Sequence, residues 1–230
     1  MKDYLYEVIP IRLFLIVTLV FYHAFAIYSG AWNPIEGYPV ISIYSVMDKL
    51  SYACLLETFV FISGYIFGYQ VRKKGVMALS ANSIFVKKFK RLIIPSILFS
   101  FLYVLLLGNI KQPITQTLYS LINGVGHMWF LPMLFWCFVG VYVFEKLNLK
   151  GNIALGILFL MIFFSVIPFP FRIGTSFYYL FFFYIGYSLQ KLGWEVPQNK
   201  SLFALSVCLF VASFILKLQI DSINGGGYQL

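Results

Sequence analysis

The stretch that decides the fold is IRLFLIVTLVFYHAF, residues 11–25. It is almost wholly apolar but carries Arg12 near its start and His23 near its end. An apolar run of this kind predicts a helix that crosses a lipid bilayer. Ionisable side chains are costly inside a bilayer, and where they occur they usually face a polar cavity and mark a functional site. One segment therefore poses both the question of fold and the question of function.

The composition of the whole chain supports a membrane protein. Of its 230 residues, 61% are hydrophobic, 20% are aromatic and only 11% are charged, whereas about a quarter of the residues of a soluble domain are charged. We therefore predict an all-α polytopic membrane bundle with about seven transmembrane helices. The candidate spans, each close to the length that a bilayer requires, are residues 9–28, 52–71, 92–109, 128–144, 153–169, 174–190 and 202–220.

The net charge of +9 is better explained by membrane orientation than by nucleic acid. Seven of the 17 basic residues lie within 72–91, between two apolar runs and without an acid among them. Because basic residues gather in cytoplasmic loops, we expect the N-terminus in the cytoplasm. The loops 29–50, rich in turn-forming residues, and 109–127 are then expected on the outer side. The chain offers no soluble module that binds nucleic acid, so we expect no such partner.

Two further features bear on the compartment. Cys54, Cys137 and Cys208 lie far apart in apolar runs and lack metal-ligand spacing, so we expect reduced packing residues and no metal site. Residues 24–26 resemble a signal-peptide cleavage site after the first apolar run. The segment before that run is charge-balanced rather than positive, which favours a retained span over a cleaved signal.

Arg12 and His23 are predicted to share one face of the first span. Eleven residues of helix turn the side chain by only about 20° from its starting direction and advance it by about 16 Å. Arg12 would then lie near the inner headgroups and His23 in the outer half of the bilayer. The alternatives are that Arg12 snorkels to the inner surface and that His23 is a hydrogen-bonded histidine at the interface. Their common face favours a polar track.

The second span contains a carboxylic acid and a small-residue pair. Glu57, in LLETFVFISGY, lies at a depth similar to that of His23 and is placed to orient its imidazole; the alternative is a neutral glutamic acid in a helix seam. Gly64 and Gly68 form a GxxxG pair, which is typical of close helix packing. The Ser63 hydroxyl is either available to a substrate or bonded to its own helix backbone.

His127 opens the stretch GHMWFLP. Pro132 is typical of the first turn of a helix, so His127 is expected at a helix N-terminus on the outer side. The helix dipole there favours a neutral imidazole, which can accept a proton or donate a hydrogen bond to a developing oxyanion. The alternative is a histidine in a surface loop. Trp129 suits packing against a sugar ring or, alternatively, belongs to the aromatic belt of the interface.

A basic cluster precedes the third span on the inner side. It consists of Lys87, Lys88, Lys90 and Arg91, followed directly by LIIP. Anionic lipid is the usual partner of such a cluster. A phosphate-rich cytoplasmic cosubstrate is the functional alternative.

Taken in order, these elements resemble the acyltransferase-3 family of membrane acyltransferases. Arg12 and His23 match the signature pair of that family's first span. Four later stretches resemble its further elements and occur in the same order: ETFVFISGY, FVKKFKRLIIPSI, GHMWFLPMLFWC and FYYLFFFYIGYSL.

The resemblance implies an O-acyltransferase in the plasma or inner membrane of a prokaryotic cell. Its donor would be a cytoplasmic acyl-CoA, acetyl-CoA in the simplest case, acting as cosubstrate without a bound cofactor. Its acceptor would be a hydroxyl of a cell-envelope glycan or of a lipid-linked sugar. The chain has fewer spans than is typical of that family, so we expect residues 1–230 to form a single domain that corresponds to the N-terminal two-thirds of a typical one and is incomplete at its C-terminus.

The resemblance implies that Arg12 and His23 are the residues most needed for activity, and the chemistry of the other polar residues suggests the further roles. Arg12 and His23 are expected to be catalytic, with Glu57 and His127 assisting. The residues expected to bind the substrates are Arg12, Lys87, Lys88, Arg91, Ser63 and Trp129.

Two other functions remain compatible with the sequence. A transporter or flippase for a polar or glycan substrate would explain Arg12 and His23 equally well, but explains the basic loop 72–91 and the GHMWFL element less readily. A truncated, inactive membrane partner is the second alternative.

Overall fold

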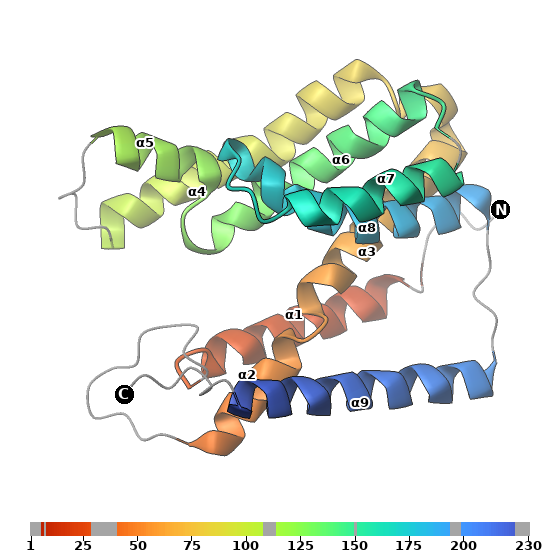
Figure 1. The fold of residues 1–230 in the computed structure, drawn as a ribbon. Helices are drawn as coiled ribbons and strands as arrows, with labels where there is room; N and C mark the ends of the chain where they lie inside the picture. The colour runs from red at the N-terminus through yellow and green to blue at the C-terminus, as the bar shows by residue number, and fades with distance from the viewer. Residues whose placement is uncertain are drawn as a thin grey trace. The chain divides into compact units, whose positions relative to one another are not determined.

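The computed structural model describes residues 6, 8–28, 41–107, 114–149, 151–193 and 199–223. Within these residues the chain is helical and contains no strand (Figure 1). The α-helices are α1 (Val8–Phe25), α2 (Ser42–Tyr52), α3 (Leu55–Lys74), α4 (Phe89–Leu107), α5 (Ile114–Asn123), α6 (Phe130–Lys146), α7 (Gly151–Phe164), α8 (Ile173–Leu192) and α9 (Lys200–Ile223). A π-helix, η2 (Asn82–Lys88), leads into α4, and short 3₁₀ turns are η1 (Gly75–Met77), η3 (Gly126–Trp129) and η4 (Pro170–Arg172).

The predicted all-α membrane fold is confirmed. Each of the seven predicted spans coincides with one helix: α1, α3, α4, α6, α7, α8 and α9. Five helical segments of the described chain are long and apolar enough to cross a membrane, namely Val8–Phe25, Ser42–Lys74, Asn82–Leu106, Gly126–Lys146 and Lys200–Ile220. Helix α7 is shorter, with 14 residues, and α8 has 20 residues but is rich in tyrosine.

Two helices lie where loops were predicted. The turn-forming residues of the predicted loop 29–50 lie outside the described residues, but the rest of that loop is α2, so the prediction is wrong from Ser42 onward. Likewise, α5 occupies part of the predicted connection 109–127. Both helices are short and amphipathic, and neither has the continuous apolar run by which spans are recognised in a sequence.

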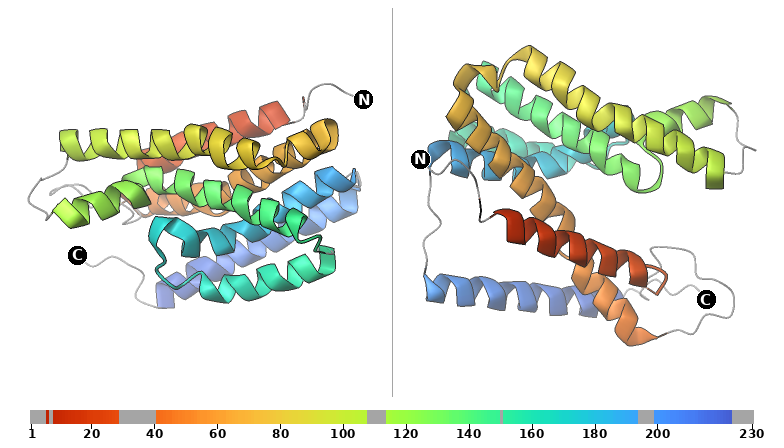
Figure 2. Two further views of the ribbon diagram at one scale, coloured as in Figure 1. Left: turned by 90° about the horizontal axis from the view of Figure 1, so that it is seen from above. Right: turned by 180° about the vertical axis from the view of Figure 1, so that it is seen from behind.

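The chain divides into two compact units. One comprises Met1–Phe59 and Glu195–Leu230, and the other comprises Val60–Trp194. In the first unit α1 packs against α2, while the membrane-length window of α9 has no residue buried within the protein. In the second unit α6 packs against both α4 and α8, and α7 packs against α8 (Figures 1 and 2).

Aromatic rings fill the interior of the Val60–Trp194 unit. The Phe138 ring of α6 lies 5.0 Å from the Phe67 ring of α3 and 4.8 Å from the Phe183 ring of α8, both edge-on. The Tyr187 ring lies 5.6 Å from that of Phe67. Edge-to-face rings at these distances add to the energy of apolar burial, so this cluster ties three helices together.

The predicted close packing at the GxxxG pair is present. A Cβ added to Gly64 would fall on the backbone carbonyl of Phe183, and one added to Gly68 would fall on that of Tyr187. On the facing helix, a Cβ on Gly186 would fall on the carbonyl of Phe61. Helices α3 and α8 thus touch backbone to backbone, which only glycine allows.

Candidate active site

Helix α1 carries the predicted catalytic pair as expected. It runs without interruption from Val8 to Phe25, so the helical spacing of about 20° and about 16 Å between Arg12 and His23 applies. Arg12 is exposed on the protein surface, whereas His23 is half-buried. The Nδ1 atom of His23 has almost no accessible surface. One end of the pair is therefore open and the other is enclosed by protein.

Helix α2 packs against α1 and brings polar and aromatic groups to it, one of which stacks on the neighbour of His23. The Tyr22 ring lies 5.0 Å from the imidazole of His23 and stacks at 4.6 Å on the Tyr52 ring of α2. On the same face of α2, Asp48 is only 2% exposed and Ser45 only 3%. The Asp48 carboxylate lies within electrostatic range of the Tyr22 hydroxyl. We call these five residues, Tyr22, His23, Ser45, Asp48 and Tyr52, the polar cluster.

Glu57 joins this cluster at its edge. It lies in the first turn of α3, half-buried, and within electrostatic range of Tyr52 and of the Cys54 thiol. Because Tyr52 stacks on Tyr22, the Glu57 carboxylate and the His23 imidazole flank one pair of tyrosine rings. The structure thus places Glu57 near Tyr52, and its predicted role in orienting the His23 imidazole stays a prediction.

Asp48 is the residue that sequence reasoning missed. In SIYSVMDKLSY, Ser45, Asp48 and Tyr52 recur at helical spacing on one face, and α2 turns Ile43, Met47 and Leu50 outward to the surface. This arrangement is inverted relative to a soluble helix, and it suits a helix with lipid outside and a polar partner inside. The periodicity was available in the sequence, but it followed a stretch of glycine and proline that favoured a loop.

The basic cluster before α4 is divided by the π-helix. Lys88, the last residue of η2, is half-buried, and its Nζ lies 3.9 Å from the centroid of the Phe138 ring and 5.4 Å from that of Phe67. Lys87 and Arg91 are exposed. Irregular π-helical turns occur frequently at functional sites. Lys90 is exposed as well, so three cations of the cluster lie on the surface and one lies against the aromatic interior.

Two serines of α4 hold the backbone of the GHMW stretch in place through hydrogen bonds. The Ser96 hydroxyl donates to the carbonyl of Met128 at 3.1 Å, and the Ser100 hydroxyl accepts from the backbone N–H of Val125 at 3.0 Å. Both serines are buried, with 1% and 0% exposure. They fix the backbone on either side of His127. The sequence showed these serines but gave no indication of their partners.

His127 itself is exposed, on the 3₁₀ turn η3 directly before α6. This is the helix-start position predicted for it. Trp129 is half-buried, and its ring lies 6.1 Å from that of Tyr179 and 5.8 Å from the Arg172 guanidinium. Ser63 is half-buried on α3 beside the close contact of Gly64 with α8.

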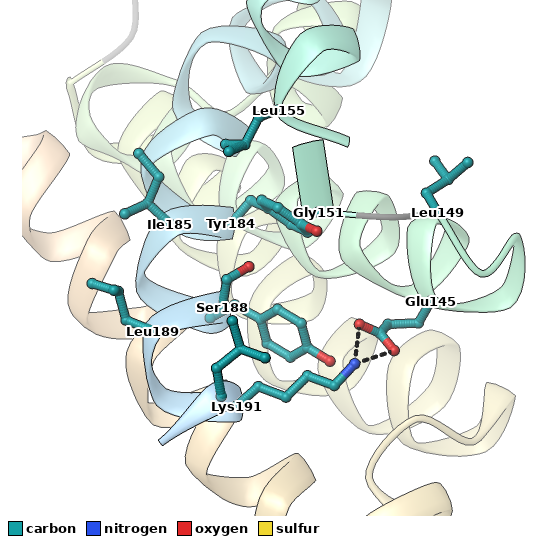
Figure 3. Close-up of a pocket in the computed structure, with 11 residues that line it drawn as sticks. Glu145, Leu149, Gly151, Leu155, Tyr184, Ile185, Ser188, Leu189 and Lys191 are labelled. Atoms are coloured by element: carbon teal, nitrogen blue, oxygen red, sulfur yellow. Dashed lines mark hydrogen bonds and ion pairs between the residues drawn. The ribbon is translucent and has the colours of Figure 1, made fainter. Parts of the chain in front are cut away.

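A pocket of about 420 Å³ lies near the C-terminal end of α8, between α6, α7 and α8 (Figure 3). Lys191 donates to both carboxylate oxygens of Glu145 at 2.7 Å, and this ion pair closes one side of the pocket. The Lys191 ammonium also lies 5.7 Å from the Tyr187 ring. None of the predicted site residues lines this pocket.

The predicted site residues therefore form two groups, one in each unit. Arg12, His23 and Glu57 belong to the first unit, together with the unpredicted Asp48. The residues of the second unit are Ser63, Lys87, Lys88, Arg91, His127 and Trp129.

Comparison with known proteins gives one match. A family model described as an acyltransferase domain, that of the acyltransferase-3 family, matches residues 6–228, which is essentially the whole chain. Neither a curated protein nor a solved structure matches the chain.

Proposed function

Because the chain belongs to the acyltransferase-3 family, we propose that it is a membrane enzyme that takes an acyl group from cytoplasmic acyl-CoA. The acyl group is acetyl in the simplest case, and the acceptor is a hydroxyl of an extracytoplasmic glycan or of a lipid-linked sugar. The observation that carries the proposal is the arrangement along α1. One uninterrupted helix bears a surface cation, Arg12, and about 16 Å further along its axis the half-buried imidazole of the polar cluster.

Binding of the donor rests on the exposed cations. Acyl-CoA carries phosphates that are too polar to enter a bilayer, so its nucleotide end must dock at a surface. Arg12, Lys87 and Arg91 are exposed, and the charge distribution of the loops predicts that all three face the cytoplasm. Guanidinium groups bind phosphates through paired hydrogen bonds. The pantetheine arm would then extend along α1 and bring the thioester to His23.

In the chemical step, the imidazole of His23 acts as the general base. It takes the proton from the acceptor hydroxyl as the oxygen attacks the thioester carbonyl. The C–S bond then breaks, and the thiolate of coenzyme A leaves with the proton returned by the imidazolium. A route through an acyl-histidine, in which His23 attacks first and the acceptor hydroxyl second, gives the same products. On either route Asp48 and Glu57 act as positioning residues, because a carboxylate near an imidazole favours one tautomer and stabilises the cation.

His127 and Trp129 are assigned to the acceptor and the oxyanion. The imidazole of His127 in front of α6 is able to donate a hydrogen bond to the developing negative charge. The Trp129 ring offers an apolar face to a sugar. The buried serines that hold the backbone around His127 give it the fixed position that preorganised donors require.

The test is acyl-CoA-dependent labelling of envelope glycans by cells or vesicles that contain the His23→Ala variant. We expect kcat to fall by about 10²-fold or more, because a general base contributes at least that much. The matched control is Phe21→Ala, which truncates an exposed ring on the same helix and should leave transfer unchanged. Undiminished transfer by His23→Ala would contradict the assignment. Substrate movement across vesicles without turnover of acyl-CoA would favour a transporter instead.

A further inference from the structure

A second polar pocket lies in the Val60–Trp194 unit, at the end of α8 opposite the Glu145–Lys191 pair. It has a volume of about 510 Å³ and is formed where the end of α5, residues 124–126 and the connection between α7 and α8 meet. Arg172 is the one charged side chain among the described residues that line it. The polar residues of its wall are Tyr119, Ser120, Asn123, Ser165, Arg172 and Thr175.

The backbone at Arg172 is held in an unfavourable conformation. Phe171 has φ 62° and Arg172 has φ 59°, so two consecutive residues with bulky side chains occupy the left-handed region. Such strain persists only where neighbouring structure imposes it, and it concentrates at functional sites. Here the Trp136 indole donates to the carbonyl of Phe171 at 2.9 Å, and Arg172 Nε donates to the carbonyl of Asn123 at 3.0 Å. The conformation is thus fixed from two sides.

This fixation leaves most of the guanidinium available. Among the described residues, Nε donates to Asn123 and the ring of Trp129 lies 5.8 Å from Cζ, which leaves the four N–H groups on the two Nη atoms to bind a ligand. No carboxylate stands among the described residues of the pocket wall. Burial lowers the pKa of Arg172, because it removes part of the hydration of the cation, and the nearby Tyr119 hydroxyl offsets part of this effect. A bound anion would supply the missing charge.

The pocket adjoins the GHMW stretch. Gly126 lines it and directly precedes His127, and the Trp129 ring lies 5.8 Å from the guanidinium carbon of Arg172. The positive charge distribution of the loops predicts that this end of α8 faces the outer side. A ligand held by Arg172 would therefore lie beside the residues that we assign to the oxyanion and to the acceptor sugar.

We propose that this pocket binds an anionic group of the acyl acceptor, a carboxylate or a phosphate, and hence that the acceptor is an acidic glycan. The proposal rests on the function proposed above and specifies its acceptor class. The fixed guanidinium would select acidic sugars over neutral ones through paired, charge-assisted hydrogen bonds. The Ser120 and Thr175 hydroxyls on the pocket wall would bond the hydroxyls of the same sugar.

The test compares two acceptors of similar size and with the same hydroxyls that differ in charge at C6, methyl β-glucuronide and its neutral amide, methyl β-glucuronamide. Transfer of radiolabelled acetyl from acetyl-CoA is measured with the full chain in nanodiscs of zwitterionic phosphatidylcholine. We expect KM for the glucuronide to be at least about tenfold lower, as one charge-assisted pair provides. Arg172→Gln should abolish this ratio and Arg172→Lys should retain part of it. Lys217→Gln, which removes another exposed cation predicted on the outer side, should keep the wild-type ratio.

Three results would overturn the proposal. Equal KM values for the two acceptors in the wild type would show that charge is not recognised. An unchanged ratio in Arg172→Gln would place the recognition elsewhere. An equal loss for both acceptors in Arg172→Gln would assign the residue a merely structural role.

Lipid phosphate shares the chemistry of an acidic sugar, and a second arm separates the two sources. Binding of methyl β-glucuronide is measured by calorimetry in nanodiscs with and without phosphatidylglycerol. We expect an Arg172-dependent affinity that the anionic lipid does not change. An affinity that falls when the lipid is added would assign the pocket to a headgroup instead. Arg172-dependent binding without transfer to any acceptor would support the anion site and overturn the proposed acyltransferase activity, so the two failures are distinguishable.

Discussion

The interiors of the two units differ in chemistry although both expose apolar side chains. In the first unit α1 turns Leu13, Phe14 and Val20 to the surface, yet it carries a half-buried histidine and packs through a pair of stacked tyrosines against α2, which holds a buried aspartate. In the second unit the interior is aromatic and is built on glycine contacts. A lipid environment favours apolar side chains on the surface of both units. The chemical difference between the two units therefore lies in their interiors. Close packing indicates stability, and an enclosed acid and imidazole indicate chemistry.

The comparison predicts that the second unit is the more sensitive to added volume. Gly64→Ala places a methyl group on the backbone carbonyl of Phe183, which cannot move without displacing α8. We expect a loss of at least about 2 kcal/mol in the free energy of unfolding and a midpoint lower by about 4–8 °C in thermal unfolding followed by tryptophan fluorescence.

Gly156→Ala is the matched control for this substitution. It makes the same chemical change in α7, where an added Cβ would have nothing within 4 Å. Its midpoint should stay unchanged or rise slightly, because alanine favours the helix. If both variants were equally stable, the close contact between α3 and α8 would not be a source of stability, and the contrast between the two units would fail.

The fold was largely predictable because its signals are local. Every predicted span became a helix, and the GxxxG pair lies at the helix contact that it predicted. Helix α2 was not predicted because nearby glycine and proline favoured a loop and because its apolar residues alternate with polar ones and form no continuous apolar run.

The candidate site was predictable only where it lies on one helix. The shared face of Arg12 and His23 follows from helical geometry alone. The packing of α2 against α1, the strained backbone at Arg172 and the serines that hold the GHMW stretch depend on contacts between segments distant in sequence. The direction of Lys88 depends on a π-helical turn, which departs from the spacing by which helix faces are predicted.

Substitutions in the polar cluster should lower the activity more than the stability of the protein. We expect Asp48→Asn to lower kcat for acyl transfer by about 10²-fold, because the amide keeps the shape of the side chain but loses the charge that positions an imidazolium. KM for acyl-CoA should change little, since Asp48 is buried whereas the cations assigned to the donor are exposed. Kinetics with purified enzyme measure the two constants separately.

Asp48→Glu and Leu50→Ala complete this experiment. The glutamate variant restores the carboxylate and should recover part of kcat, whereas a purely structural aspartate would not be rescued by a longer side chain. Leu50 is exposed on the opposite face of α2, so its truncation should leave kcat unchanged. A parallel fall of kcat and of the unfolding midpoint in Asp48→Asn would indicate that the cluster stabilises the fold and does not serve the reaction.

The smallest effect on stability is expected at the Glu145–Lys191 ion pair, which lies in the second unit, Val60–Trp194. Its geometry is short and bidentate, but the two side chains remain 22% and 39% exposed, so water and salt screen the attraction. A double-mutant cycle with Glu145→Gln and Lys191→Met should give a coupling free energy of about 0.2–1 kcal/mol, and less at high salt. A coupling well above 1 kcal/mol that salt does not reduce would mean that the pair is shielded like the polar cluster. The second unit would then also hold a protected charge pair, and interior polarity would no longer separate the two units.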